Sequence, residues 1–321
     1  MDYKDNKEAV DALRVSYEKF FNEIQKVIVG QDEVIKQVII AILSGGHGLL
    51  VGVPGLAKTL LVNTIAQILG LEYKRIQFTP DLMPSDIIGT EVIDSNKAFK
   101  FVKGPLFANV ILADEINRTP PKTQAALLEA MQERMVTAAG NTYKLDDPFF
   151  VLATQNPIEL EGTYPLPEAQ LDRFMFNIKV DYPSVEEEID IVKRTTADYT
   201  TSLDPVISKE DILFFQQLVR KIPVNQNILE YAVKLAVKSR PSFEDSAPVS
   251  DKYLVWGAGP RASQYLILGA KTHAVLNGKY SPDIEDVQSV APAIMRHRIV
   301  KNYKAEAEGI SVEDIIHELL A

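Results

Sequence analysis

A short apolar run at residues 49–51 leads directly into the segment GVPGLAKT at residues 52–59, and a helical pattern follows. Glycines allow such a loop to curl until several backbone N–H groups point inward, where they can bind an anion. The following helix adds the positive end of its dipole. This order of strand, loop and helix predicts a phosphate-binding loop that follows a central strand of a parallel sheet.

Two residues at the end of this loop carry the expected chemistry. Lys58 is predicted to reach the β- and γ-phosphates of a nucleotide, and Thr59 to ligate Mg²⁺ through its hydroxyl. The general motif has glycine before the lysine, whereas this chain has Ala57. The alternative is a turn that merely joins a strand to a helix. The residues predicted to bind the nucleotide here are Gly52, Pro54, Gly55, Leu56, Ala57, Lys58, Thr59 and Leu60.

A second apolar run, residues 110–113, ends in Asp114 and Glu115. Such a run is typical of a buried parallel strand, and open α/β sheets bind ligands at the carboxyl ends of their strands. Asp114 is predicted to hold Mg²⁺ together with Thr59, and Glu115 to act as general base toward a hydrolytic water. Two solvated loop acids are the alternative interpretation.

The strands and helices alternate in the first part of the chain. Strand-like runs at 73–78, 149–153 and 174–180 complete a set of five, and helical patterns at 58–69 and 122–133 lie between them. This alternation predicts an α/β fold, a parallel five-stranded sheet with helices on both faces.

After Pro183 every periodic segment has helical spacing. We therefore expect two domains: residues 1–184, a nucleotide-binding α/β domain with an N-terminal helix, and residues 185–321, a smaller all-helical domain. The last predicted helix covers residues 284–300.

Composition excludes several classes of function. The 321 residues contain no cysteine and only four scattered histidines, which excludes thiolate chemistry and argues against a histidine metal site. The net charge of −10 argues against a nucleic-acid partner. We see no secretory signal and no apolar run long enough to span a bilayer, so we expect a cytoplasmic protein without direct membrane insertion.

Taken together, these motifs resemble the MoxR family of AAA+ ATPases over nearly the whole chain. The Ala57 variant of the phosphate loop resembles that family's own form, which supports the assignment. The other segments that carry the resemblance are DEINR (114–118), PPKTQ (120–124), LLEAMQE (127–133), ATQNP (153–157) and EAQLDRF (168–174). The resemblance implies an AAA+ sheet followed by a helical lid, with ATP and Mg²⁺ as cofactors.

The resemblance also implies roles for residues that spacing alone does not single out. Asn156 is similar to sensor 1, which would orient the attacking water; a polar cap at a strand end is the alternative. Arg173 is similar to the arginine finger, offered to the nucleotide of a neighbouring subunit. For Arg173 the alternative is a surface ion pair, for instance with Asp172.

Arg261 is similar to sensor 2, which would connect the lid to the γ-phosphate. The alternative is an arginine without a function at a helix N-terminus, although the helix dipole disfavours a cation there. Val29 and Gly30 resemble the segment that contacts adenine.

Two hairpins are expected outside the sheet. Residues 87–90 and 98–101 fit one pair of strands, and residues 136–145 fit another that turns at Gly140 and Asn141. In the family such loops project from the ring and act on substrates; two passive surface hairpins are the alternative.

The leading hypothesis is a MoxR-type, Mg²⁺-dependent ATPase that assembles as a homo-oligomer, expected to be a hexameric ring. The resemblance implies chaperone-like remodelling of protein clients, including von Willebrand factor A domain proteins, or metal insertion. Two alternatives stay open: a chelatase-type AAA+ motor, and a nucleotide-dependent binding switch without turnover. A DNA-remodelling motor is disfavoured by the negative charge.

Overall fold

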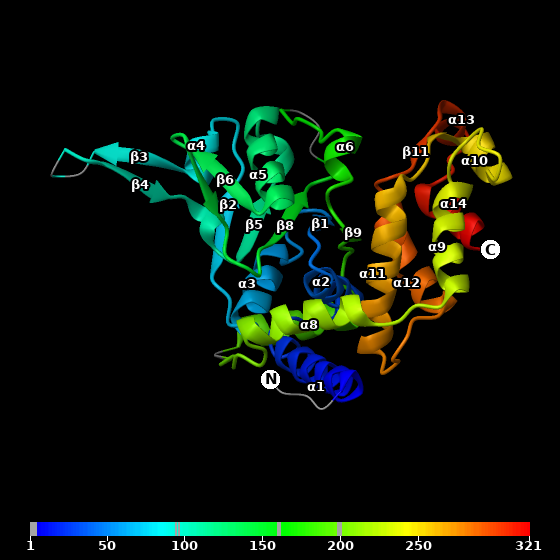
Figure 1. Ribbon diagram of the computed structural model, residues 1–321, viewed down its shortest axis with the longest axis horizontal. Helices are drawn as coiled ribbons and strands as arrows, with labels where there is room; N and C mark the ends of the chain where they lie inside the picture. The colour runs from blue at the N-terminus through cyan, green and yellow to red at the C-terminus, as the bar shows by residue number, and fades with distance from the viewer. Residues whose placement is uncertain (1–4, 94, 96, 159–161, 198–200) are drawn as a thin grey trace.

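Five parallel strands form the central sheet, in the order β2-β5-β8-β1-β9 (Figure 1). The computed structural model describes residues 5–93, 95, 97–158, 162–197 and 201–321. The strands are β1 (Gly48–Val51), β2 (Tyr73–Gln77), β5 (Val110–Asp114), β8 (Phe150–Gln155) and β9 (Phe176–Lys179). The predicted parallel five-stranded sheet is confirmed.

The register of the sheet aligns the carboxyl ends of the strands. Val51 pairs with Gln155 across β1 and β8, and Gln77 pairs with Asp114 across β2 and β5. The phosphate loop leaves β1 at this edge, between β8 and β9. Residues that follow β1, β5 and β8 therefore converge on one place, although the ends of these strands lie 41 to 104 positions apart in the chain.

Helices cover both faces of the sheet, which explains the continuous apolar runs. Val110 and Leu112 belong to a core shared with α2 (Asp32–Leu43) and α3 (Lys58–Ile68). The intervening Ile111 belongs to a core on the other face, shared with α5 (Pro121–Glu133). Because both faces are buried, these strands carry apolar residues at every position.

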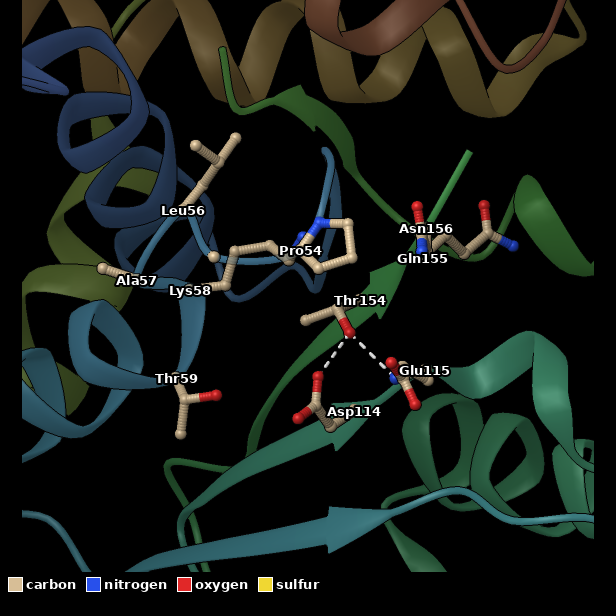
Figure 2. Close-up of a pocket in the computed structure, with 11 residues that line it drawn as sticks. Pro54, Leu56, Ala57, Lys58, Thr59, Asp114, Glu115, Thr154, Gln155 and Asn156 are labelled. Carbon is tan, nitrogen blue, oxygen red and sulfur yellow. Dashed lines mark hydrogen bonds between the residues drawn. The ribbon is translucent and has the colours of Figure 1, made fainter. Parts of the chain in front are cut away.

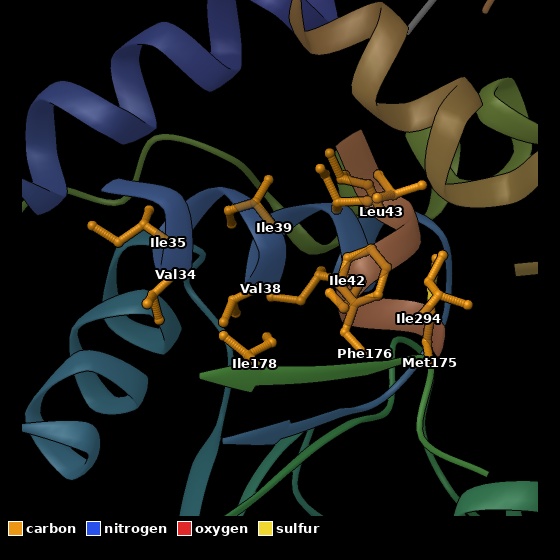
Figure 3. Packing of buried hydrophobic residues seen from close by; sticks show 14 of the residues in the cluster. Val34, Ile35, Val38, Ile39, Ile42, Leu43, Met175, Phe176, Ile178 and Ile294 are labelled. Atoms are coloured by element: carbon orange, nitrogen blue, oxygen red, sulfur yellow. The ribbon is translucent and has the colours of Figure 1, made fainter. Parts of the chain in front are cut away.

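Helix α2 packs its apolar side on the edge strand β9. Val38 and Ile42 lie over Ile178 and Phe176 (Figure 3), and all four side chains are at most 2% exposed. β-Branched residues fill this layer because a stiff side chain loses little freedom when it is buried against a pleated surface.

The chain after β9 is mainly helical, and the helices from residue 226 onward, called the lid helices below, stand to one side of the sheet (Figure 1). Its helices are α7 (Val185–Thr196), α8 (Lys209–Lys221), α9 (Gln226–Lys238), α10 (Pro248–Tyr253), α11 (Pro260–Leu276), α12 (Ile284–Met295), α13 (Tyr303–Ala307) and α14 (Val312–Leu320). None of the helices in the described part of the chain is long and apolar enough to cross a membrane.

A small antiparallel ladder in this region was not predicted. It pairs β10 (Leu254–Trp256) with β11 (Val300–Lys301). The last predicted helix, 284–300, is therefore too long, because α12 ends at Met295. Strands of two or three residues show too little alternation to be recognised, and pairing across 44 to 47 positions is decided by tertiary contacts.

The N-terminal helix α1 (Asn6–Ile24) connects the two parts of the chain. It packs against α3 below the sheet and against α8 and α11. Leu13, Phe20 and Ile24 are fully buried there, in a core that continues into the lid helices. This core crosses the predicted boundary, so the division into two domains at residue 184 stays a prediction.

Both hairpins are present outside the sheet, and one projects far from the body (Figure 1). They pair β3 (Gly89–Ile93) with β4 (Phe99–Lys103), and β6 (Met135–Ala138) with β7 (Asn141–Lys144). The expectation that residues 87 and 88 belong to the first hairpin is wrong. They end the short helix α4 (Pro84–Ile88), whose start is capped by the Asp86 carboxylate.

Candidate functional site

The loop between β1 and α3 adopts the curled shape that its sequence predicts. Gly55 has φ +87° and Ala57 has φ +54°, so the chain turns through the left-handed region twice. Ala57 stands where the general motif has glycine, at a cost of about 1 kcal/mol for an L-residue. Gly52 is required for space, since a Cβ there would lie 2.5 Å from the carbonyl oxygen of Val180.

This loop forms one wall of a cavity of about 340 Å³ (Figure 2). The lining residues are Pro54, Gly55, Leu56, Ala57, Lys58, Thr59, Asp114, Glu115, Thr154, Gln155 and Asn156. The structure thus brings together most of the predicted nucleotide-binding loop, both acids and Asn156. Gly52 and Leu60 do not line the cavity.

The Lys58 ammonium is held within the loop. It donates to the backbone carbonyl of Gly52 and, at 2.9 Å, to that of Val53. Burial lowers the pKa of Lys58, and the nearby carboxylates of Asp114 and Glu115 act in the opposite direction. The cation therefore lies between the loop backbone and two acids, as expected for a group that binds a phosphate chain beside a metal.

Asp114 is 8% exposed, and its carboxylate is oriented by β8. The Thr154 hydroxyl donates to Asp114 Oδ1 at 2.7 Å and accepts from the backbone N–H of Glu115 at 2.8 Å (Figure 2). One hydroxyl thus fixes both acidic positions. Thr154 lies within the ATQNP segment, but the sequence alone suggested no role for it.

The edge strand β2 contributes residues that the sequence analysis missed. Arg75 donates two N–H groups to Asp114 Oδ2, at 3.0 and 2.6 Å, and Gln77 donates to Glu115 Oε2 at 2.7 Å. Arg118 lies 3.2 Å from the same Glu115 oxygen. Residues 75 and 77 share one face of β2, because side chains alternate between the two faces of a strand. This alternation was the only pattern in the sequence that connects the two residues.

The donor set of the cavity suits Mg²⁺ bound beside a phosphate chain. Thr59 offers a hydroxyl and Asp114 a carboxylate, and Mg²⁺ prefers such oxygen ligands. Within the described ranges no cluster of three or more acidic, histidine or cysteine side chains could hold a metal alone. Mg²⁺ commonly takes only one or two carboxylates from a protein and completes its shell with phosphate and water.

Asn156 follows the last residue of β8 and is 7% exposed. Its side chain lines the cavity, as the sensor 1 prediction requires. Its Oδ1 also accepts from the backbone N–H of Ile158 at 3.2 Å, so it caps the strand end as well. Both interpretations are compatible with this position.

Arg173 and Arg261 lie outside this cavity. Arg173 donates to the carbonyl of Leu128 at 2.8 Å, and Arg261 pairs with Asp172 at 2.9 Å. The two arginines line a second cavity together. Asp172 is paired with Arg261 and with the buried Arg298, so the structure does not show the ion pair of Arg173 with Asp172.

Val29 and Gly30 also lie outside the first cavity but close to its loop. The adjacent Gln31 donates to the carbonyl of Leu56 at 3.3 Å. Gly30 has φ +64°, and a Cβ there would meet the Glu187 carboxylate at 2.1 Å. The predicted contact with adenine stays a prediction.

Two family models match the chain. Residues 47–176 match the ATPase family associated with various cellular activities (AAA), and residues 246–319 match the AAA lid domain. The chain is 43% identical over 304 residues to Chaperone MoxR1 of Mycobacterium tuberculosis, covering 94% of this chain and 80% of that protein. This chain belongs to the MoxR family of AAA+ ATPases.

Two further similarities agree with MoxR-family membership. The uncharacterized protein YeaC of Bacillus subtilis is 43% identical over 307 residues, covering 94% of this chain and 92% of that protein. A crystal structure of a protein from Cytophaga hutchinsonii has a TM-score of 0.91 and 45% identity, covering 98% of this chain and 96% of that one. The AAA+ fold with a helical lid, expected from the resemblance, is confirmed.

Proposed function

We propose that this MoxR-family chain is a Mg²⁺-dependent, ATP-hydrolysing motor that remodels partner proteins as a chaperone. The observation that carries the proposal is the convergence of Lys58, Asp114 and Asn156 on one cavity from the ends of three neighbouring strands. Chemistry on a phosphate chain needs these three kinds of group: a cation, a metal-holding carboxylate and an amide that orients water.

Different residues of the cavity have separate roles in ATP hydrolysis. Lys58 and the loop N–H groups bind the β- and γ-phosphates, while Thr59 and Asp114 hold the ion. Bound Mg²⁺ neutralises charge on the phosphates. Glu115 accepts the proton of the attacking water as its oxygen bonds to the γ-phosphorus and the bond to the leaving ADP oxygen breaks. Asn156 orients that water.

The positions of Arg173 and Arg261 support assembly into a homo-oligomer, which we propose is a hexameric ring. Both line the second cavity rather than the first, so any contact that they make with a nucleotide would be with that of a neighbouring copy. An arginine that neutralises charge on the transferred phosphoryl group accelerates related reactions by roughly 10³–10⁵. Arg261 does not line the cavity formed by its own phosphate loop. This position therefore does not support a sensor 2 contact with the nucleotide bound to the same chain.

The proposed client is another protein. The relative named a chaperone, with 43% identity, supports this class of client. We carry von Willebrand factor A domain proteins and metal insertion as expectations from the family resemblance. The experiment below separates the motor from a binding switch without turnover. A chelatase-type motor, which also hydrolyses ATP, is the other alternative.

The test is steady-state ATPase activity with Mg²⁺, measured against protein concentration. Specific activity should rise with concentration, because assembly brings a neighbour's arginines to each site. Glu115→Gln is the matched control, since it removes the base and leaves the cavity's shape. Bound nucleotide without turnover at any concentration, in wild type and control alike, would contradict the motor and favour the binding switch.

A further inference from the structure

Arg75 of β2 reaches the Asp114 carboxylate from outside the first cavity. Asp114 lines that cavity together with Thr59, whereas Arg75 is not among its lining residues. Arg75 places two N–H groups on Asp114 Oδ2, and the Thr154 hydroxyl donates to Oδ1. A carboxylate offers about four lone-pair positions, two on each oxygen. Both positions of Oδ2 are therefore taken, and one position of Oδ1 remains.

The oxygen that Arg75 occupies is directed toward the side of Thr59. In the view of Figure 2 the dashed line from Thr154 marks Oδ1, and the second Asp114 oxygen points to the side on which Thr59 lies. Thr59 and Asp114 supply the oxygens of the cavity that suit Mg²⁺. The guanidinium of Arg75 thus supplies the positive charge beside an oxygen that the ion would need.

The two partners of this ion pair differ in burial. The Asp114 side chain is 12% exposed, and that of Arg75 is 48% exposed. A buried carboxylate needs a cation beside it, because an unpaired buried charge is strongly destabilising. A half-exposed guanidinium keeps much of its hydration and can leave at little cost. By contrast, the Arg296 side chain, which pairs with Glu313, is only 12% exposed. Arg75 is therefore the exchangeable partner, and Asp114 is the fixed one.

Both acids that line the cavity already have cations beside them. Arg118 lies 3.2 Å from Glu115, and the charge of Lys58 interacts with both carboxylates. A divalent cation that arrives alone therefore meets carboxylates whose charge is already offset. A phosphate chain adds several negative charges and further oxygen ligands to the same cavity. These charges attract the ion and also offset the counter-charge that Arg75 loses when it leaves Asp114.

We propose that Arg75 is a positioning residue that makes metal binding depend on the nucleotide. It holds Asp114 Oδ2 in place of the ion when no nucleotide is bound, and it gives up this oxygen when Mg²⁺ enters together with ATP. Thr154 keeps the carboxylate in its orientation during the exchange. The inference rests on the proposed role of Asp114 in holding Mg²⁺, but it does not require that the protein hydrolyses ATP.

The first experiment measures Mn²⁺ binding to the full chain without nucleotide, by electron paramagnetic resonance of the free ion. Mn²⁺ takes the same kinds of oxygen ligand as Mg²⁺. Arg75→Gln should bind Mn²⁺ about ten-fold more tightly than wild type, the effect of removing a competing charge-assisted hydrogen bond. Lys74→Gln is the matched control and should bind like wild type. It removes the same charge from the adjacent residue of β2, but Lys74 pairs with Glu72 and faces the other side of the strand.

Several results of this titration would overturn the proposal. Equal or weaker Mn²⁺ binding by Arg75→Gln would show that Arg75 does not compete with the ion. An equal gain in Lys74→Gln would attribute the effect to net charge. A gain that persists in the double variant Arg75→Gln/Asp114→Asn would place the ion away from Asp114.

Melting temperatures are measured for each variant. If Arg75→Gln does not fold, Arg75→Lys replaces it, because an ammonium keeps the charge but lacks the planar fork of two donors. Arg75→Lys should also bind Mn²⁺ more tightly than wild type, by a smaller factor. A folded Arg75→Lys with unchanged or weaker Mn²⁺ binding contradicts the proposal.

The second experiment repeats the Mn²⁺ titration on protein saturated with a non-hydrolysable ATP analogue. Arg75→Gln should now bind Mn²⁺ within about three-fold of wild type, because the nucleotide has already relieved the competition. A loss of affinity would show that Arg75 merely orients Asp114. An equal gain with and without nucleotide would show that Arg75 weakens metal binding in both states, which also overturns the proposal. Failure of the proposed function would instead appear as inactive wild type with both Mn²⁺ results unchanged.

Discussion

Arg75 places two N–H groups on one carboxylate oxygen of Asp114, at 3.0 and 2.6 Å. The other oxygen of Asp114 accepts from Thr154. The carboxylate is therefore held from both neighbouring strands, β2 and β8, before any ligand binds. A site oriented in advance loses less conformational freedom when an ion and a phosphate chain arrive.

Substituting Lys58 with alanine should abolish detectable nucleotide binding. The ammonium is the cation inside the phosphate loop, and its loss removes charge-assisted hydrogen bonds, a loss of roughly 100-fold or more in affinity. Titration with a fluorescent ATP analogue measures this. Lys74→Ala is the control, since Lys74 is an exposed lysine paired with Glu72. Equal affinity of Lys58→Ala and wild type would rule out the phosphate-loop assignment.

Glu115→Gln should keep nucleotide affinity within about three-fold while turnover falls by roughly 10²–10⁴, because the amide cannot accept the proton of water. Binding and steady-state phosphate release measure the two effects on the same preparation. A variant with normal turnover would show that another group is the base.

Arg173→Ala should retain nucleotide but lose hydrolysis. Arg173 lines the second cavity and not the first, so its substitution leaves the chain's own phosphate loop intact. Mixing Arg173→Ala with Glu115→Gln should restore part of the turnover, since each variant supplies the group that the other lacks. Lack of rescue in verified mixed assemblies would count against action between subunits.

Thr154→Val should lower both stability and turnover. The change keeps the shape but removes the hydroxyl that contacts Asp114 and the Glu115 N–H, which leaves a partly buried donor unsatisfied at a cost of about 1–3 kcal/mol. Denaturant unfolding measures the free energy. Thr154→Ser, which keeps the hydroxyl, should stay close to wild type; equal losses in both variants would attribute the effect to packing alone.

Stability should fall as the pH decreases from about 6.5 toward 3. Burial lowers the pKa of His47 to about 3 from its ordinary 6.5, so the unfolded chain binds a proton that the folded chain does not. The stabilisation is complete above pH 6.5 and is lost by up to about 1.4 kcal/mol per pH unit below it. Unfolding at a series of pH values measures the slope.

A substitution of His47 isolates its share of this pH dependence. His47 Nδ1 accepts from the backbone N–H of Val151, and its Nε2 donates to Met131. His47→Gln should be less stable at pH 7 but show a shallower slope. Buried His297 has a lowered pKa as well and should account for part of the remaining slope. An unchanged slope in His47→Gln would contradict the prediction.

Local patterns were sufficient for the elements that carry the first cavity. The apolar run, the glycines and the following helix predicted the loop around Lys58, and the second run predicted a buried strand ending at Asp114. These signals lie within short stretches of chain, where backbone preferences and burial on both sheet faces act directly. The order of motifs then supported the family, which the comparisons confirm.

The tertiary structure decided which distant residues meet. Sheet order places β2 beside β5, which brings Arg75 and Gln77 to the acids, and no local pattern contains that order. The lid's packing joins Arg261 to Arg134 and Arg173, three residues separated by 39 and 88 positions. Strand pairing and helix docking depend on burial summed over the whole chain, so neighbours in space that are remote in sequence appear only after folding.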